Sequence, residues 1–201
     1  MKIGTVLFDG FELLDVYGPL EMFSLIGEHV RLLTFAQTPG LITSSPGPQS
    51  FAEAALTDAN DLDVLLIPGG RGTRHEVNNE PLLEALRHAS ERARYVASVC
   101  TGSALLAKAG LLDGKCATTN KRAYAWVTSQ GTATHWIAEA RWVVDGKFFT
   151  SAGISAGMDM ALALISHLCG KDTAHTIAQR AEYEWHQDPA RDPFAKLNGI
   201  A

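Results

Sequence analysis

YVASVCTGSALLA, residues 95–107, joins an apolar strand pattern to a helix pattern rich in small residues, with Cys100 at the junction. A reactive side chain at such a strand-to-helix turn is held in a strained conformation above the carboxyl edge of a sheet. Gly102 and Ser103 are small and leave room for the tight turn. The stretch predicts an α/β fold in which Cys100 is presented as a nucleophile.

The same alternation of apolar strand patterns and helical periodicity runs along the whole chain. It predicts one domain, residues 1–201, with a mainly parallel central sheet covered by helices on both faces. The expected strands are Ile3–Phe8, Val30–Ala36, Val64–Pro68, Tyr95–Val99 and one near Lys147–Ser151, and the expected helices are Gly18–Ile26, Pro81–Ala93, Ser103–Gly110, Ala123–Ser129, Gly157–Cys169 and Thr173–Trp185.

Two further segments interrupt this alternation, and a tail follows it. Thr38–Pro48 is rich in Gly, Pro, Ser and Thr and predicts a loop or a short hairpin. Trp142–Phe149 contains Asp145-Gly146 between β-favouring residues and predicts a hairpin. The tail after Trp185 is expected to pack on the surface or to fray.

Composition indicates a globular protein with no electrostatic preference for polyanions. The chain has 46% hydrophobic and 19% charged residues and a net charge of -5, whereas nucleic acids and anionic membranes recruit basic faces. The N-terminus lacks the features of a signal peptide, and no apolar run is long enough to span a bilayer. Three widely spaced cysteines favour a reducing compartment, so we expect a cytoplasmic protein.

Cys100 is the strongest candidate for chemistry. The helix that follows directs its positive end toward the sulfur, which predicts a lowered pKa and a thiolate. The alternative is an ordinary buried thiol, because free cysteine is among the most buried residue types. Cys116 and Cys169 have no comparable setting and are interpreted as structural.

A second glycine-rich turn, Pro68-Gly69-Gly70-Arg71-Gly72, ends the Val64–Pro68 strand pattern. Ligands of doubly wound sheets gather at the carboxyl ends of adjacent strands, so this turn is expected to face Cys100. The N–H groups of Gly70 and Thr101 could then form a two-donor pocket for developing negative charge. The alternative is a plain turn. A phosphate loop is excluded because the Gly-Lys-Ser/Thr ending is missing.

Asp15 is the favoured acid or base. It lies among Leu13, Leu14, Val16 and Tyr17, and a carboxylate with apolar neighbours has a raised pKa suited to proton transfer. Asp15 could instead be a helix cap. None of the seven histidines is adjacent to Cys100 in sequence, so the hypothesis is a site without histidine.

These motifs together resemble the ThiJ/PfpI superfamily. The resemblance runs from about Lys2 to Trp185, and it is carried by Asp15-Val-Tyr-Gly-Pro19, Ile67-Pro-Gly-Gly70, Ser98-Val-Cys-Thr-Gly102, Ala117-Thr-Thr119 and Thr150-Ser-Ala-Gly-Ile-Ser-Ala-Gly157. It implies a flavodoxin-like three-layer sandwich of the class I glutamine amidotransferase-like kind, a homodimer, a small-molecule substrate and no metal or organic cofactor. It also implies that Cys100, Thr101 and Asp15 are the active residues. From the two glycine-containing turns themselves, we expect Gly69, Gly70 and Gly102 around the substrate.

The chain departs from the superfamily's pattern at two places. Proteases and glyoxalase-like members commonly have His after the nucleophile, where this chain has Thr101, which makes a protease less expected. Hydratase-like and regulator-like members often have His-Trp after the two threonines, where this chain has Asn120-Lys121, and this second departure motivates a glyoxal or an amide as an alternative substrate. The motifs are most similar to those of members that hydrate isonitriles to N-substituted formamides. The alternatives are a glyoxalase-like or amidase-like enzyme and a non-catalytic module that senses redox state or binds a small molecule.

Overall fold

A seven-stranded sheet lies at the centre of the protein, whose residues 1–200 are described by a computed structural model. The strand order is β10-β11-β7-β6-β1-β2-β5, and only β10 runs antiparallel to its neighbour. The bounds are β1 Lys2–Val6, β2 Arg31–Ala36, β5 Ala54–Ala55, β6 Val64–Ile67, β7 Tyr95–Val99, β10 Trp142–Asp145 and β11 Phe148–Ser151.

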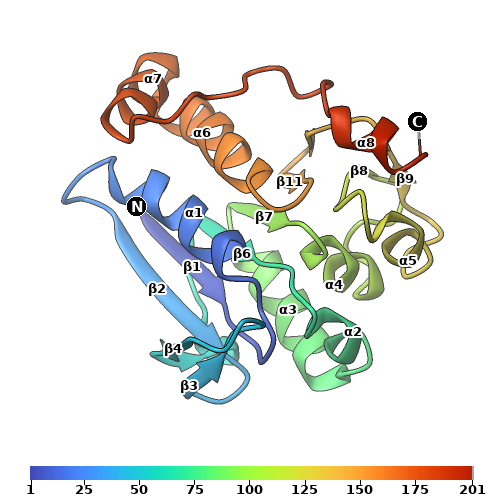
Figure 1. The fold of residues 1–201 in the computed structure, drawn as a ribbon. Helices are drawn as coiled ribbons and strands as arrows, with labels where there is room; N and C mark the ends of the chain where they lie inside the picture. The colour runs from blue at the N-terminus through green and yellow to red at the C-terminus, as the bar shows by residue number, and fades with distance from the viewer. Residues whose placement is uncertain (201) are drawn as a thin grey trace.

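Helices cover both faces of this sheet and complete a three-layer α/β sandwich (Figure 1). One layer holds α1 (Leu13–Ser24), α6 (Ala156–Cys169) and α7 (Lys171–Arg180), which pack on one another. The other layer holds α2 (Thr73–Glu76), α3 (Glu80–Arg92), α4 (Gly102–Lys108) and α5 (Tyr124–Thr128). Every residue of β6 is buried, as expected of a parallel strand covered on both faces. The predicted fold class is therefore confirmed.

Smaller elements lie at the edges of the sandwich. β3 (Gly40–Thr43) and β4 (Gln49–Ala52) form an antiparallel hairpin, which decides between the two expectations for that segment. The hairpin predicted around Asp145-Gly146 is confirmed as β10–β11, with Gly146 at φ 60°. The remaining pieces are β8 (Cys116–Ala117), β9 (His135–Trp136), a 3-10 turn at Leu56–Asp58 and α8 (Pro193–Leu197).

The prediction of helix bounds was wrong at two places. Helix α1 begins at Leu13, five residues before the predicted start, so Pro19 lies inside the helix rather than near its beginning. Helix α7 ends at Arg180 instead of reaching Trp185, because Glu182 adopts a left-handed φ of 48° that an α-helix cannot continue. The first of these differences places Asp15 on the first turn of a helix.

The tail after Trp185 packs on the protein. It continues to α8, whose Ala195 is fully buried, and Arg141 N–H donates to the carbonyl of Pro189 at 2.7 Å. Of the residues described, none belongs to a helix long and apolar enough to cross a membrane.

Candidate functional site

The candidate site lies where four adjacent strands of the sheet end. In the order β11-β7-β6-β1, these strands are followed by Gly153, Cys100, Gly69 and the turn into α1 that carries Asp15. Parallel strands bring their carboxyl ends to one edge, which explains how residues from distant parts of the chain meet there.

Cys100 occupies the turn between β7 and α4 and has a left-handed backbone, with φ 57°. This conformation is strained for a residue with a side chain, and it persists because the neighbours fix it. The Cys100 N–H donates to the Ser151 carbonyl at 3.2 Å, and the Cys100 carbonyl accepts from Thr119 Oγ1 at 2.9 Å and Ser103 Oγ at 3.2 Å. The predicted strand-to-helix turn is thus present, with the sulfur at its apex.

The predicted thiolate is not supported. Burial raises the pKa of the Cys100 thiol well above its ordinary value, and the neighbouring Asp15 carboxyl raises it further. The N–H of Thr101 and the side chain of Asn120 lower the pKa, but by less than burial raises it. The prediction of a lowered pKa was wrong because desolvation of the sulfur outweighs the effect of the helix end. Cys100 is a neutral thiol at rest.

Asp15 lies beside Cys100, on the first turn of α1, and is fully buried. Its Oδ2 accepts the N–H of Gly69 at 2.9 Å, whereas Oδ1 has no hydrogen-bond partner within residues 1–200. Burial raises the pKa of Asp15 to about 8, Glu12 adds to this through its like charge, and the Gly69 N–H opposes it. The predicted raised pKa is confirmed. The alternative of a helix cap is wrong, because the N-cap position belongs to Glu12.

The turn after β6 meets Thr101 in a closed set of hydrogen bonds. The N–H of Gly70 donates to Thr101 Oγ1 at 3.0 Å, and the hydroxyl of Thr73 contacts the same oxygen at 3.1 Å. The Gly70 N–H is therefore engaged, and the predicted two-donor pocket of Gly70 and Thr101 is not formed. Gly70 has φ 130°, and a Cβ there would lie 2.6 Å from the nitrogen of Glu12, so only glycine fits. Gly69 and Gly102 lie in the same closely packed region.

Asn120 and Gly153 contact Cys100, although the sequence did not single them out as site residues. A Cβ on Gly153 would lie 2.6 Å from Cys100 Sγ. Asn120 Oδ1 accepts the N–H of Ala123 at 3.0 Å, and its side chain hydrogen-bonds to the Cys100 thiol. The signal for Asn120 was its unusual place after the two threonines, but sequence alone does not show that this turn reaches the sulfur.

A pocket of about 400 Å³ opens above Cys100 and Thr101. Its rim carries three guanidinium groups and one carboxylate, from Arg71, Arg74, Arg122 and Glu12. No histidine of the described chain lines it. The arrangement provides a buried thiol, a buried carboxyl with a pKa near neutrality and space for a small molecule, which together suit nucleophilic addition with proton transfer.

A cysteine on a strand-to-helix turn at the carboxyl edge of a parallel sheet, beside a buried carboxyl, defines the class: a three-layer α/β protein with a cysteine elbow. The chain belongs to the DJ-1/PfpI family, whose model matches residues 1–167.

Similar proteins include an enzyme, a regulator and a solved structure. The chain is 39% identical to isonitrile hydratase of Pseudomonas putida over 91% of this chain and 78% of that protein. It is 29% identical to the HTH-type transcriptional regulator GbdR of Pseudomonas aeruginosa over 98% of this chain, but it spans only 56% of the regulator. A ThiJ/PfpI family protein from Pseudomonas syringae superposes with a TM-score of 0.84 at 28% identity, over 99% of this chain and 84% of the other. Deglycases are also among the relatives.

Proposed function

We propose that the protein hydrates isonitriles to N-substituted formamides in the cytoplasm, with Cys100 as nucleophile and Asp15 as proton donor and acceptor. The observation that carries the proposal is the contact between two buried acids, the Cys100 thiol and the Asp15 carboxyl, whose pKa values are both raised. The similarity to isonitrile hydratase over 91% of the chain supports the choice of substrate.

A pair of protonated acids suits the first step, because addition of a thiol to an isonitrile carbon delivers both a sulfur and a hydrogen to one atom. The Asp15 carboxyl protonates the isonitrile carbon while Cys100 Sγ bonds to it, and the thiol proton passes to the Asp15 carboxylate. The product is a thioimidate, with sulfur, hydrogen and a doubly bonded nitrogen on the former isonitrile carbon. Asp15 is protonated again at the end of this step.

Water completes the reaction. It adds across the carbon–nitrogen double bond, giving nitrogen its hydrogen and carbon its hydroxyl group. The hydroxyl then loses its proton to become the formamide carbonyl, the carbon–sulfur bond breaks, and sulfur recovers a proton. The sum is one isonitrile plus one water to one formamide. The N–H of Thr101 and the side chain of Asn120, both near the sulfur, stabilise negative charge on it when it leaves.

The direct test is incubation with simple alkyl and aryl isonitriles and measurement of the formamide. Cys100→Ser should lower turnover by roughly a thousandfold or more, because the weaker nucleophile is also harder to ionise. The matched control is Cys116→Ser, which changes a partly buried cysteine outside the pocket and should leave turnover unaltered. Absence of formamide from a wild-type protein whose Cys100 is readily alkylated would rule out the reaction.

Other functions of this fold give other products. Lactate from methylglyoxal or ammonia from an amide would instead favour a glyoxalase-like or amidase-like enzyme. A peroxide-sensing role is weakened by the raised pKa of Cys100, because oxidation proceeds through the thiolate. Intact-mass measurement after mild peroxide would reveal oxygen added at Cys100 if the protein is a sensor.

We also propose a homodimer. The apolar side chains of Leu20, Met22 and Phe23 on α1 are buried within one chain and are not available for an interface. The proposal depends on Tyr17, which is exposed on the same helix and lines neither pocket near Cys100. Light scattering at micromolar concentration should give twice the mass of one chain, and a single-chain mass would refute it.

A further inference from the structure

The C-terminal segment is anchored to the turn that contacts Cys100, although it lies beyond the residues that the family model matches. Its anchor is Asp192, which precedes α8 and caps it by accepting the N–H of Phe194 at 3.0 Å. Asp192 is almost fully buried, so its carboxylate needs a partner inside the protein.

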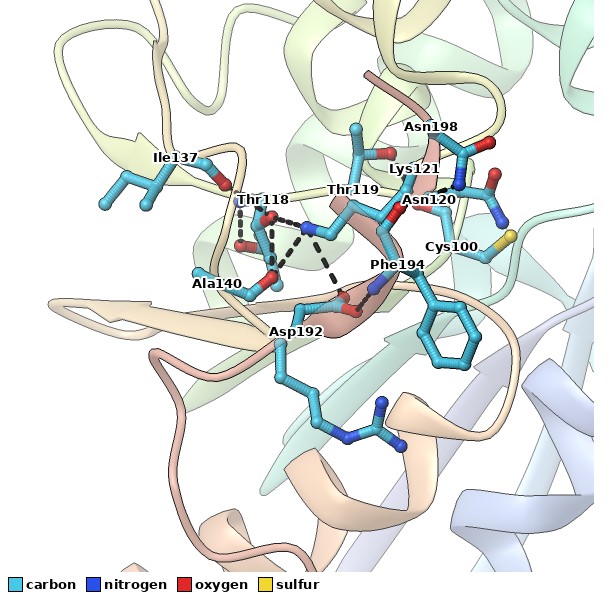
Figure 2. A network of polar contacts seen from close by, with 12 residues as sticks. Cys100, Thr118, Thr119, Asn120, Lys121, Ile137, Ala140, Asp192, Phe194 and Asn198 are labelled. Carbon is cyan, nitrogen blue, oxygen red and sulfur yellow. Dashed lines mark hydrogen bonds and ion pairs between the residues drawn. The ribbon is translucent and has the colours of Figure 1, made fainter. Parts of the chain in front are cut away.

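That partner is the ammonium group of Lys121, which is also buried. Figure 2 shows Lys121 Nζ between Thr118 Oγ1 at 2.7 Å, the Ala140 carbonyl at 2.6 Å and Asp192 Oδ2 at 3.7 Å. Buried charges are retained only where each has its counter-charge, so the position of α8 depends on the Asn120-Lys121 turn. Asn120, the adjacent residue, contacts the Cys100 thiol.

Beside the Cys100 pocket lies a second hollow of about 610 Å³. The two share Glu12, Asn120, Arg122 and Ile154, so they adjoin. Four large apolar side chains line this second hollow, two near the Cys100 pocket and two from α8. Those near the pocket are Leu14 and Ile154, exposed to 40% and 41%, and those of α8 are Phe194 and Leu197, exposed to 48% and 77%. Exposed apolar side chains gathered around one hollow are typical of a binding site.

We propose that α8 is the wall that selects the substrate: an uncharged aliphatic or aromatic substituent lies between Leu14 and Ile154 on one side and Phe194 and Leu197 on the other. The reacting carbon is then held at Cys100. Lys121 and Asp192 are positioning residues that keep this wall in place. The proposal rests on the proposed function for the identity of the substrate, but the wall itself can be tested without that reaction.

The first experiment changes the wall and varies the size of the substituent. In Phe194→Ala, kcat/KM for isonitriles with large alkyl or aryl substituents should fall roughly tenfold or more, while the value for methyl isonitrile stays nearly constant. The control is Phe51→Ala, since Phe51 is also an exposed phenylalanine, at 59%, but lies on the β3–β4 hairpin outside both hollows. The proposal would be overturned if Phe194→Ala changed kcat/KM equally for isonitriles of every size, or changed it for none of them.

The same variants are compared in Cys100 alkylation by N-alkyl maleimides of increasing size. Phe194→Ala should change the ratio of rates between large and small reagents, and Phe51→Ala should not. This ratio stays measurable even if no isonitrile is converted. A changed ratio without formamide would refute the proposed function and keep the wall, whereas formamide with an unchanged ratio and no size dependence would refute the wall alone.

The second experiment tests the anchor. Lys121→Met and Asp192→Asn should each raise KM for large substrates, with kcat for methyl isonitrile changed by less than about twofold, because each leaves one buried charge without its partner. Asn keeps the cap of α8, so the loss is of charge and not of the helix. The double variant removes both charges and should recover part of the selectivity. Wild-type selectivity in both single variants would show that the pair does not position α8.

Discussion

Asp15 and Asp159 are alike in sequence setting and differ in partners. Each lies in the first turn of a helix, α1 or α6, the two helices pack together, and both carboxyl groups are fully buried. Asp159 is paired with Arg141 Nε at 2.6 Å and also accepts from the hydroxyl of Tyr183 and the N–H of His186, both at 3.0 Å. Asp15 accepts one backbone N–H and contacts the Cys100 thiol, and none of the residues described places a cation beside it.

The difference indicates how one side chain serves two purposes in a single protein. A buried carboxyl with a cation and full hydrogen bonding is fixed in place and joins parts of the chain, here the strand β10 region and the segment after α7. A buried carboxyl without a cation beside it is more stable in its protonated form, because burial disfavours the charged form and raises the pKa. It can therefore exchange a proton near neutral pH. Asp159 is accordingly expected to support the fold and Asp15 the reaction.

The largest expected effect is on stability, from Asp159→Asn. Removing the carboxylate leaves Arg141 buried without a counter-charge, which should lower the free energy of unfolding by about 3–5 kcal/mol. Urea unfolding followed by circular dichroism measures it. Asp15→Asn, compared at the same pH, should lose much less. If the two variants were destabilised equally, the contrast between the two carboxyl groups would be invalid.

The next effect is on activity, from Asp15→Asn. Asn preserves the shape of the side chain but cannot exchange a proton, so kcat/KM for an accepted isonitrile should fall by roughly a hundredfold or more. Initial rates of formamide formation are compared with those of Asp58→Asn, an exposed aspartate far along the chain. Near wild-type turnover in Asp15→Asn would leave Cys100 as a candidate and remove Asp15 from the proton transfer.

Sequence reasoning predicted the elements around these residues well, because strand and elbow patterns are local. The Tyr95–Val99 strand and the Cys100 turn depend on neighbours within a few residues, and both were found. The pKa of Asp15 was also predicted in direction, since its apolar neighbours are adjacent in sequence.

Features set by distant residues were not predictable in the same way. The pKa of Cys100 is raised by burial and by Asp15, which is far upstream in the chain. A prediction from the neighbouring helix end alone therefore had the direction of the pKa shift wrong. Asn120 reaches the sulfur because its turn comes close to Gly153, which follows β11 and also contacts Cys100. The ion pair of Lys121 with Asp192 joins residues that no local pattern connects.

The pH dependence of stability provides a third test. Between the ordinary pKa of 3.8 and about 8, Asp15 is ionised in the unfolded chain but protonated in the folded protein, so the folded state holds more protons. Stability contributed at this site is therefore greatest below the lower value and falls as pH rises, at up to about 1.4 kcal/mol per pH unit. Asp15→Asn removes this slope. Urea unfolding from pH 4 to pH 8 should show the variant gaining on the wild type, and parallel curves would contradict the raised pKa.

The smallest effect concerns Glu12, whose like charge contributes to the raised pKa of Asp15. In Glu12→Gln this repulsion is removed, the carboxylate form of Asp15 becomes less unfavourable, and its pKa falls. Because the reaction needs protonated Asp15, the alkaline limb of the profile of kcat/KM against pH should move to lower pH by less than about one unit. Glu12 also lines the pocket, so the height of the profile can change, but the midpoint reports Asp15 independently of height. Glu21→Gln, an exposed change on the same helix, should leave the midpoint in place. A midpoint that stays constant or moves upward in Glu12→Gln would mean that the group titrating in that limb is not Asp15.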